Sequence, residues 1–162
     1  MARGYAQNAM TTHRDTKLLP YTPEQLYTLV ADIERYPEFL PWCQALRIRN
    51  RDMNKGHEVI DADMVIAFKM FRERFGSRVK LTPATQEIDV SYIDGPFKYL
   101  TNQWRFHEAE GGTNVEFFVD FEFKSRLLQS TIGVVFGEAM RRIVTAFETR
   151  AQDLYGSPDL NA

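Results

Sequence analysis

Apolar and polar residues alternate with a period of two through most of the chain between residues 44 and 123. The alternating runs are separated by MNKG, TPAT, DGPF and EGGT, which contain the glycine, proline and small polar residues of tight turns. Because successive side chains of a strand point to opposite faces, each run predicts a strand with one apolar face. Short turns between consecutive strands make the sheet antiparallel, with one covered face.

The individual runs show which residues face inward. With a first strand over Thr12–Leu19, the pattern predicts seven strands. The inward face of one central run consists of Ile60, Ala62, Met64, Ile66 and Phe68. The last run places four apolar residues on one face: Phe117, Val119, Phe121 and Phe123. We expect Phe121, in the middle of this aromatic run, to lie in closed core.

The cover for this face is predicted in the C-terminal segment, where apolar residues recur at helical spacing. They are Leu128, Ile132, Val135, Phe136, Ala139, Met140, Ile143, Phe147, Ala151 and Leu154. A helix of this extent is ~40 Å long at about 1.5 Å per residue. Gly156 and Pro158 are expected to end it.

A shorter helix is predicted after the first strand, in YTPEQLYTLVADI. Thr22 is its expected N-cap, Pro23 its first residue, and Gln25 completes a capping box. Pro37 and Pro41 then leave room only for a second short helix or a bend, because the residue before a proline is pushed out of the helical region.

These elements predict an α+β helix-grip fold: a curved seven-stranded antiparallel sheet wrapped around a long C-terminal helix, with two short helices between strands one and two. A chain of 162 residues fits one domain, which we assign to residues 11–158. Residues 1–10 are expected to be a tail or a cloning remnant, and residues 159–162 a tail.

Charge and cysteine content exclude several functions. The net charge is −2 and basic residues are interleaved with acidic ones, so no DNA-binding surface is predicted. Cys43 is the only cysteine, which excludes an intramolecular disulfide and a thiolate zinc site and fits a reducing, cytoplasmic compartment. Charged residues within the segment 127–147 argue against a membrane-spanning helix.

Few residues suggest catalysis. Asp61 and Asp63 lie on the polar face of a strand beside a strand that carries Arg74 and Arg78, so cross-strand ion pairs explain them. The histidines, His13, His57 and His107, lie on separate predicted elements without an evident acidic partner. Ser77 and Ser91 are read as ordinary strand residues. We therefore predict no catalytic residue and no metal site.

A curved sheet and one helix rarely close without a gap, so an apolar cavity is expected between them. YPEFLPW and GPFKYL are two irregular aromatic segments that fit the rim of its mouth, although plain core is the alternative. Trp104 has an indole N–H that could meet a polar ligand group. Gly133 and Gly137 indicate either a loosened helix or the close approach of another backbone or a ligand.

Three segments, YTPEQLYTLVADIERYPEFLPWC, DGPFKYLTNQWRF and VEFFVDFEFKSRLLQ, resemble the coenzyme Q-binding branch of the START-like (polyketide cyclase/lipid-transport) superfamily. The resemblance extends over about Thr12–Gly156. It implies a helix-grip domain that holds a lipophilic ligand, an isoprenoid quinone (ubiquinone), and supports respiratory electron transport without redox chemistry of its own. Bacterial relatives of this branch are also described as ribosome-association toxins that hinder subunit joining, which is the alternative function.

The expected function is therefore non-catalytic binding or transport of a lipophilic ligand, with no required cofactor. The expected partners are an isoprenoid quinone or another lipid and, transiently, a membrane surface; the ribosome is the alternative partner. The expected location is the cytoplasm, peripheral to the inner face of a membrane. The predicted cavity and rim residues are Tyr36, Phe39, Leu40, Trp42, Met64, Phe68, Phe97, Tyr99, Trp104, Ile132, Phe136 and Met140.

Overall fold

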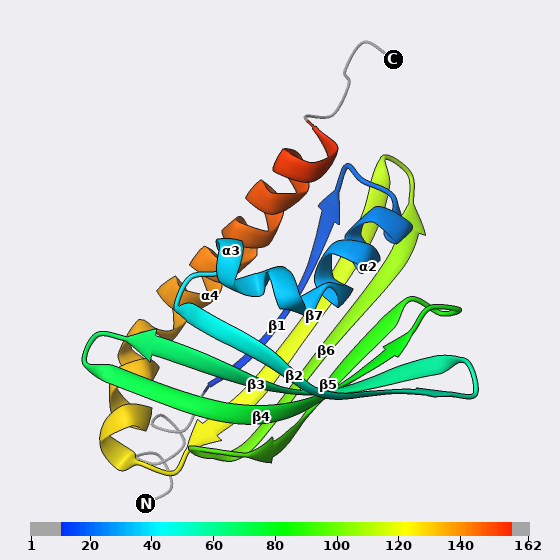
Figure 1. Ribbon diagram of the computed structural model, residues 1–162. Coiled ribbons are helices and arrows are strands. Elements are labelled where there is room, and N and C mark those ends of the chain that lie inside the picture. Colours follow the sequence, from blue (N-terminus) through cyan, green and yellow to red (C-terminus); the bar gives the residue numbers. More distant parts are fainter. Residues whose placement is uncertain (1–10, 157–162) are drawn as a thin grey trace, which may run out of the picture.

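A computed structural model describes residues 11–156 (Figure 1). The strands are β1 (Thr12–Leu19), β2 (Cys43–Asn54), β3 (His57–Phe68), β4 (Phe71–Thr82), β5 (Glu87–Asp94), β6 (Phe97–Ala109) and β7 (Gly112–Phe123). The helices are α2 (Pro23–Ala31), the short 3-10 helix η1 (Ile33–Arg35), α3 (Tyr36–Phe39) and α4 (Arg126–Tyr155). The predicted tails and Pro158 lie outside the described residues.

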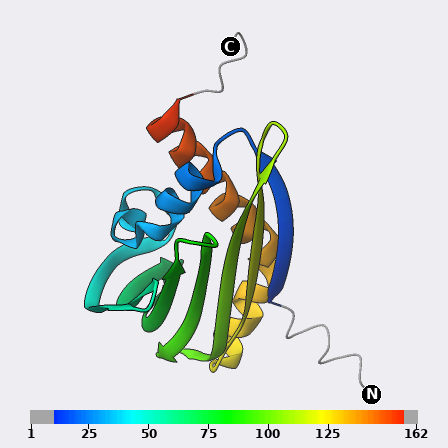
Figure 2. The same ribbon diagram turned by 90° about the vertical axis from the view of Figure 1, so that its right-hand side faces the viewer.

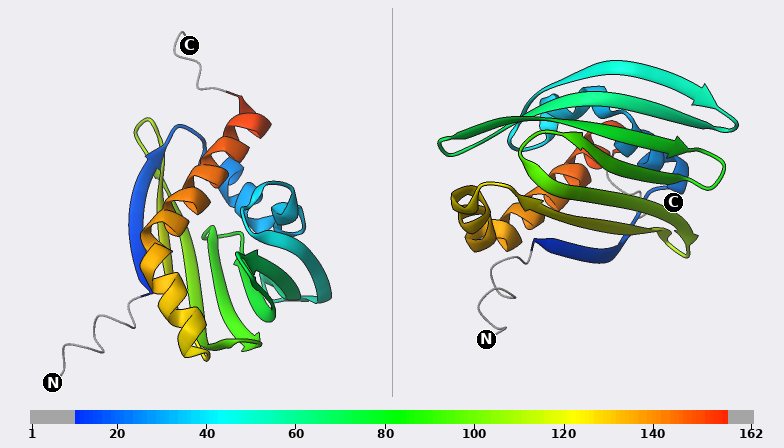
Figure 3. Two further views of the ribbon diagram at one scale, coloured as in Figure 1. Left: turned by 90° about the vertical axis from the view of Figure 1, so that its left-hand side faces the viewer. Right: turned by 90° about the horizontal axis from the view of Figure 1, so that it is seen from below.

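All seven strands form one antiparallel sheet in the order β1-β7-β6-β5-β4-β3-β2. The sheet is curved, and α2, α3 and α4 all lie on its concave side (Figure 2). Figure 3 shows α4 running along this concave face with the short helices beside its C-terminal half. The predicted helix-grip fold is thus confirmed, including the two short helices between the first and second strands.

The start of α2 shows why this segment is helical. The Thr22 side chain accepts a hydrogen bond from the Gln25 backbone N–H at 3.0 Å. In return the Gln25 side chain accepts from the Thr22 backbone N–H, also at 3.0 Å. These two bonds satisfy N–H groups that have no partner inside a helix, and Pro23 lacks one altogether. The capping box predicted from the sequence is confirmed.

Polar contacts fix α4 to the rest of the fold at both of its ends. Near its N-terminus the buried Gln129 side chain accepts from the backbone N–H of Phe123 in β7 at 2.9 Å. Near its C-terminus the Tyr155 hydroxyl donates to the backbone carbonyl of Gln25 in α2 at 2.9 Å. The middle of α4 is therefore held across the concave face by contacts at its two ends.

A β-bulge at the start of β6 corrects one prediction. The GPFKYL segment was expected to be irregular, but Phe97 and Tyr99 both belong to the strand β6. Phe97 pairs with Phe123 and Tyr99 with Glu122, so Lys98 is an extra residue without an opposite partner. An extra residue shifts the alternation of side chains by one position. Phe97 is consequently buried, whereas Tyr99 points outward and is 40% exposed.

Ion pairs on the outer face of β2, β3 and β4 account for the paired aspartates. Asp61 accepts two hydrogen bonds from Arg78, at 2.8 and 2.9 Å. Asp63 is buried and accepts from Arg49 at 2.5 and 2.9 Å, and it also pairs with Arg74. The hydrogen bonds from Arg49, reinforced by Arg74, hold the pKa of the Asp63 carboxyl below its ordinary value. Both aspartates form the cross-strand ion pairs that the sequence predicts.

Replacement of Asp63 is expected to destabilise the fold in a pH-dependent way. The folded-state pKa of Asp63 is depressed, so its contribution is complete above the unfolded value of about 3.9 and disappears as the pH falls through the lower folded value. Asp63→Asn should lower the free energy of unfolding by about 1–3 kcal/mol at pH 7. Urea unfolding at pH 7 and at lower pH measures this difference.

The matched control is Glu110→Gln, in the exposed turn between β6 and β7. It should leave the unfolding curve unchanged at both pH values. An Asp63→Asn protein as stable as the wild type at pH 7 would show that the arginines around Asp63 contribute nothing to the fold.

Candidate ligand-binding cavity

An apolar cavity of about 280 Å³ lies between the concave face of the sheet and α4. Its walls come from the inward faces of β2 to β7, from the α3–β2 connection and from the middle of α4. The cavity exists because α4 is fixed at its ends while the sheet curves away beneath its middle. Apolar side chains line almost all of it, so it suits a lipophilic molecule.

The structure brings all but two of the predicted site residues to this cavity. Those that line it are Tyr36, Leu40, Trp42, Met64, Phe68, Phe97, Trp104, Ile132, Phe136 and Met140. Phe39 does not line it: its ring packs on Phe147 at 5.3 Å and under the guanidinium of Arg150 at 5.1 Å. Tyr99 is on the opposite face of the sheet, where its hydroxyl lies 3.3 Å from Asp120. That the lining residues bind a ligand remains a prediction.

The expected contrast between Trp104 and Phe121 is wrong in one respect. Both side chains line the cavity, so Phe121 is not in closed core. The indole N–H of Trp104 donates to the side-chain oxygen of Asn102 at 3.2 Å. Asn102 in turn donates to the backbone carbonyl of Phe118 at 2.8 Å. The Trp104 ring is therefore held in place by Asn102, and its donor is already used.

Three polar lining residues were missed by the sequence analysis: Cys43, Ser77 and Asn102. Ser77 lies on the same face of β4 as Phe75 and Val79, and Asn102 shares a face of β6 with Trp104. For Ser77 and Asn102 the period-two pattern contained this information, since each is two positions from an inward apolar residue. Cys43 is different, because the register of β2 shifts between Cys43 and Ala45. Burial raises the pKa of the Cys43 thiol to about 11, so the thiol is neutral at physiological pH.

Trp42 stands at the mouth of the cavity in an unusual backbone conformation. Its φ is 67°, in the left-handed region that residues with a side chain rarely adopt. The turn is closed by a 3.3 Å hydrogen bond from the Cys43 N–H to the Leu40 carbonyl, and glycine is the usual residue at this position of such a turn. The indole packs edge-on against Phe68 of β3, with ring centroids 5.6 Å apart.

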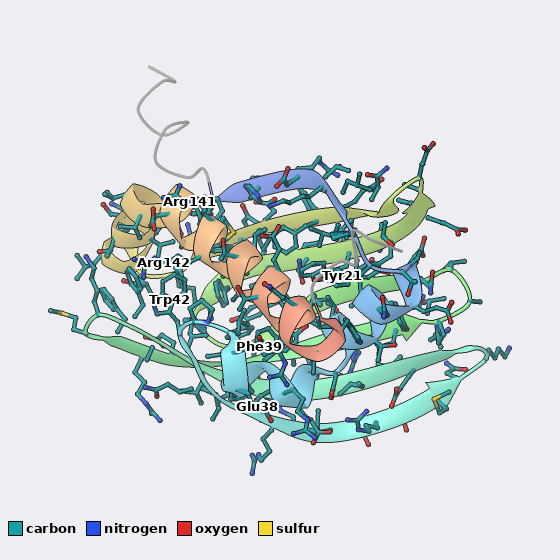
Figure 4. All side chains as sticks on the ribbon, turned by 90° about the horizontal axis from the view of Figure 1, so that it is seen from above. Tyr21, Glu38, Phe39, Trp42, Arg141 and Arg142 are labelled. Carbon is teal, nitrogen blue, oxygen red and sulfur yellow. The ribbon has the colours of Figure 1, made fainter. Side chains whose placement is uncertain are left out.

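Arg141 and Arg142 lie beside this mouth. In Figure 4 Arg142 of α4 is near Trp42, on the side of α4 that faces α3 and β2. Pro41 lies with both arginines around a shallow surface depression outside the cavity. Both arginines form ion pairs with Glu138, which lies three and four residues before them, about one turn earlier in the same helix. The mouth is thus apolar inside and charged at its outer edge.

The histidines take no part in the cavity. His107 has an acidic partner that was not expected: its Nε2 lies 3.1 Å from Glu116 on the neighbouring strand β7. The His13 ring lies 5.9 Å from that of Phe117 and 6.5 Å from that of Phe136. Between residues 11 and 156, no three histidine, cysteine, aspartate or glutamate side chains gather closely enough to hold a metal ion.

The surroundings of Gly137 decide between a loosened helix and the close approach of another group. A β-carbon at this position would meet nothing within 4 Å. Neither another backbone nor the cavity wall approaches it, so close approach does not explain this glycine. A locally loosened helix remains as its interpretation.

A curved antiparallel sheet wrapped around a long helix, with an apolar cavity between them, defines the START-like helix-grip class. The chain belongs to the family described as "Polyketide cyclase / dehydrase and lipid transport", which matches residues 19–148. This confirms the resemblance to the START-like superfamily. None of the helices between residues 11 and 156 has an apolar stretch long enough to cross a bilayer.

Relatives within the family carry two kinds of name. The chain is 38% identical over 148 residues to "Ribosome association toxin RatA" of Rickettsia prowazekii, covering 90% of this chain and 99% of that protein. It is 32% identical over 152 residues to "Coenzyme Q-binding protein COQ10 homolog B, mitochondrial" of Xenopus laevis, covering 91% of this chain and 61% of that one. The solution structure of the 18 kDa protein CC1736 from Caulobacter crescentus superimposes with a TM-score of 0.77 at 40% identity, covering 90% of this chain and 99% of that one.

Filling the cavity should separate ligand binding from folding. Ala139 of α4 is buried and lines the cavity, so Ala139→Phe should occupy ligand volume without exposing core. We expect the variant to lose lipid binding and to keep its thermal midpoint within a few degrees. Retention of a fluorescent fatty-acyl or prenyl probe and a thermal melt measure the two properties.

Gly137→Ala is the matched control for Ala139→Phe, because it alters the same helix at a position with open space around it. It should stabilise the helix by about 0.5–1 kcal/mol and leave probe binding unchanged. Full probe binding by a folded Ala139→Phe protein would show that the cavity is not the binding site.

The turn at Trp42 allows a second test. Trp42→Gly relieves the left-handed backbone conformation but removes the indole from the mouth. We expect little net change in stability and a severalfold faster release of a bound lipid, measured by transfer of a fluorescent probe to vesicles. Lys55, also at positive φ but in the exposed β2–β3 turn, provides the control: Lys55→Gly should not change the release rate. Equal release rates in the wild type, Trp42→Gly and Lys55→Gly would show that the Trp42 indole does not slow the exit of a bound lipid.

Proposed function

We propose that the protein binds and carries an isoprenoid quinone, ubiquinone or a close analogue, and thereby supports respiratory electron transport without catalysing a reaction. The observation that carries this proposal is the apolar cavity beneath the middle of α4. The similarity to a protein named as coenzyme Q-binding supports the same ligand class.

The chemistry of the lining supports binding rather than catalysis. The Cys43 thiol is neutral, because burial raises its pKa to about 11. Burial also raises the pKa of Tyr36, whose hydroxyl donates to the Val30 carbonyl at 2.5 Å. Among the described lining residues, none is an acid, histidine or lysine that could activate the Ser77 hydroxyl. The family name includes cyclases and dehydrases, so chemical conversion of the bound molecule by the purified protein would contradict this proposal.

The size of the cavity indicates which part of the ligand it holds. At about 280 Å³ it lies just below the usual volume of ligand pockets, which is about 300–1,000 Å³. It therefore fits a ring with the first part of a prenyl tail, and the remaining tail leaves through the mouth. Burial of each methylene contributes about 0.8 kcal/mol, but a bilayer offers nearly the same, so the tail cancels in the exchange and the ring decides specificity.

A surface beside the cavity supports transient contact with a membrane. Leu127 and Val134 on α4 are 68% and 84% exposed, and Met70 in the β3–β4 turn is 88% exposed. Figures 1 and 3 place this turn beside the N-terminal half of α4. Exposed apolar side chains with Lys69 and Arg126 near them suit an anionic bilayer surface. We accordingly propose a cytoplasmic protein that visits the inner face of a membrane.

Organic extraction of the purified protein followed by lipid mass spectrometry tests this function. We expect an isoprenoid quinone in the extract of the wild type and none in that of Ala139→Phe. The proposal would be contradicted if both extracts contained the same lipids, or if the wild-type extract contained no isoprenoid quinone.

Ribosome association is the second candidate, and the names of several relatives favour it. The outer face of β2–β4 offers a surface for an anionic partner, because it carries more arginine and lysine than acid. Arg47 is strongly exposed: its side chain is 84% exposed and lies 3.8 Å from Asp63, which Arg49 and Arg74 already contact. Arg72 and Lys80 lie exposed on the same face of β4.

Sedimentation with ribosomal subunits distinguishes the two candidates. If this face binds the ribosome, Arg47→Glu with Lys80→Glu should abolish co-sedimentation, while Ala139→Phe should leave it unchanged. Under the lead proposal the wild type does not co-sediment with subunits at physiological salt. Co-sedimentation at physiological salt that requires Arg47 and Lys80 and weakens as the salt concentration rises would favour the ribosome over the quinone.

A further inference from the structure

One hydroxyl group in the cavity has no hydrogen-bond partner within the fold. Ser77 lines the cavity from β4, and only 7% of the residue is exposed. Among the described residues, no backbone or side-chain group forms a hydrogen bond with its hydroxyl. Buried polar groups are almost always hydrogen-bonded, so an unpartnered one that faces a cavity points to a ligand atom.

The neighbours of Ser77 leave its hydroxyl open to the cavity. Its cross-strand partners are Ala62 of β3, which has a small side chain, and Tyr92 of β5. The Tyr92 hydroxyl is already engaged, because it accepts from the backbone N–H of Phe97 at 3.0 Å. The inward residues two positions away on β4 are Phe75 and Val79, both apolar. The Ser77 hydroxyl is thus a single polar group on an apolar wall.

A second polar group lies on the same concave face, two strands from Ser77. Asn102 is on β6, with β5 between it and β4 (Figure 1). Its oxygen accepts from the Trp104 indole, which can only donate, and its nitrogen donates to the Phe118 carbonyl, which can only accept. This fixes the orientation of the amide. The second N–H of the Asn102 amide is not used by these two hydrogen bonds. Like the Ser77 O–H, it can be donated to a ligand.

We propose that the Ser77 hydroxyl donates a hydrogen bond to an oxygen atom of the bound ligand, so that the cavity selects an isoprenoid with an oxygen-bearing ring over a hydrocarbon of the same size. This inference rests on the proposed function and names the group that recognises the quinone ring. Asn102 positions Trp104 at the same wall.

The contact discriminates because its absence leaves a buried donor unpaired. A site that hydrogen-bonds a ligand oxygen rejects an analogue without that oxygen, whereas apolar contacts with the prenyl tail are common to both. Within residues 11–156 this hydroxyl has no protein partner, with or without a ligand. Its removal should therefore not destabilise the ligand-free fold, although it should weaken binding of the quinone.

Two probes and two variants test this inference in the full-length protein. The probes are a dimethoxybenzoquinone with two isoprene units and a benzene ring that carries the same tail but no oxygen. The variants are Ser77→Ala and, as the matched control, Ser91→Ala, which removes an exposed serine from the neighbouring strand β5. Binding of both probes, the thermal midpoint without ligand and the infrared carbonyl band of the bound quinone are measured.

Ser77→Ala should weaken quinone binding about three- to tenfold. It should leave binding of the oxygen-free probe unchanged, shift the carbonyl band to higher frequency, and keep or raise the thermal midpoint of the empty protein. Ser91→Ala should match the wild type throughout. A lower midpoint for Ser77→Ala, or quinone binding equal to that of the wild type, would overturn the inference while leaving the cavity as the lipid site. Failure of the wild type to bind either probe would overturn the proposed function itself.

Discussion

The attachment of α4 at both of its ends determines the rest of this architecture. Gln129 holds the first turns to the end of β7, and Tyr155 holds the last turn to α2. A sheet of seven strands twists and curves, so it cannot follow a straight helix of 30 residues along its whole length. Where the two surfaces separate, apolar side chains face a space that they do not fill. The cavity therefore follows from the geometry of the layers.

An apolar cavity of this kind suits reversible binding of a lipid better than tight binding. The tail of an isoprenoid lipid is stabilised in a bilayer about as well as in the protein, so transfer between them can be nearly balanced. The bilayer and the protein differ in the hydrogen bonds that they offer to the polar atoms of the ring. A hydroxyl such as that of Ser77, buried on an apolar wall, offers a directed contact that a hydrocarbon layer lacks. The ring would then determine which lipid is bound, while the tail would determine how easily the lipid moves between the protein and the bilayer.

The sequence predicted the fold well because its strongest patterns are local. Period-two alternation, the Thr22–Gln25 capping box and the helical spacing after residue 127 each depend on neighbouring residues only. Most of the cavity lining followed from the same alternation. The exceptions depend on pairing between strands: the extra residue Lys98 turned Tyr99 outward, and the register of β6 with β7 placed Glu116 beside His107.

Polar residues in the cavity were harder to recognise for a different reason. Alternation places Ser77 and Asn102 inward, yet a serine or an asparagine on a strand gives no indication of whether the fold supplies its partner. Only the three-dimensional contacts show that the side chain of Asn102 is engaged and that of Ser77 is not. The turn at Trp42 was also not predicted, because the sequence Pro-Trp does not indicate a positive φ at a position where glycine is usual.

A quinone bound beneath the middle of α4, as proposed, would lie against methionine methyl groups that report on it directly. Met64 and Met140 line the cavity, whereas Met53 and Met70 are 74% and 88% exposed. The measurement is a methyl NMR spectrum of the full-length protein titrated with a short-chain ubiquinone, with nuclear Overhauser contacts from the ring methoxyl protons. We expect contacts to Met64 and Met140 and none to Met53. Contacts confined to exposed methyl groups, with Met64 and Met140 unperturbed at saturation, would contradict it.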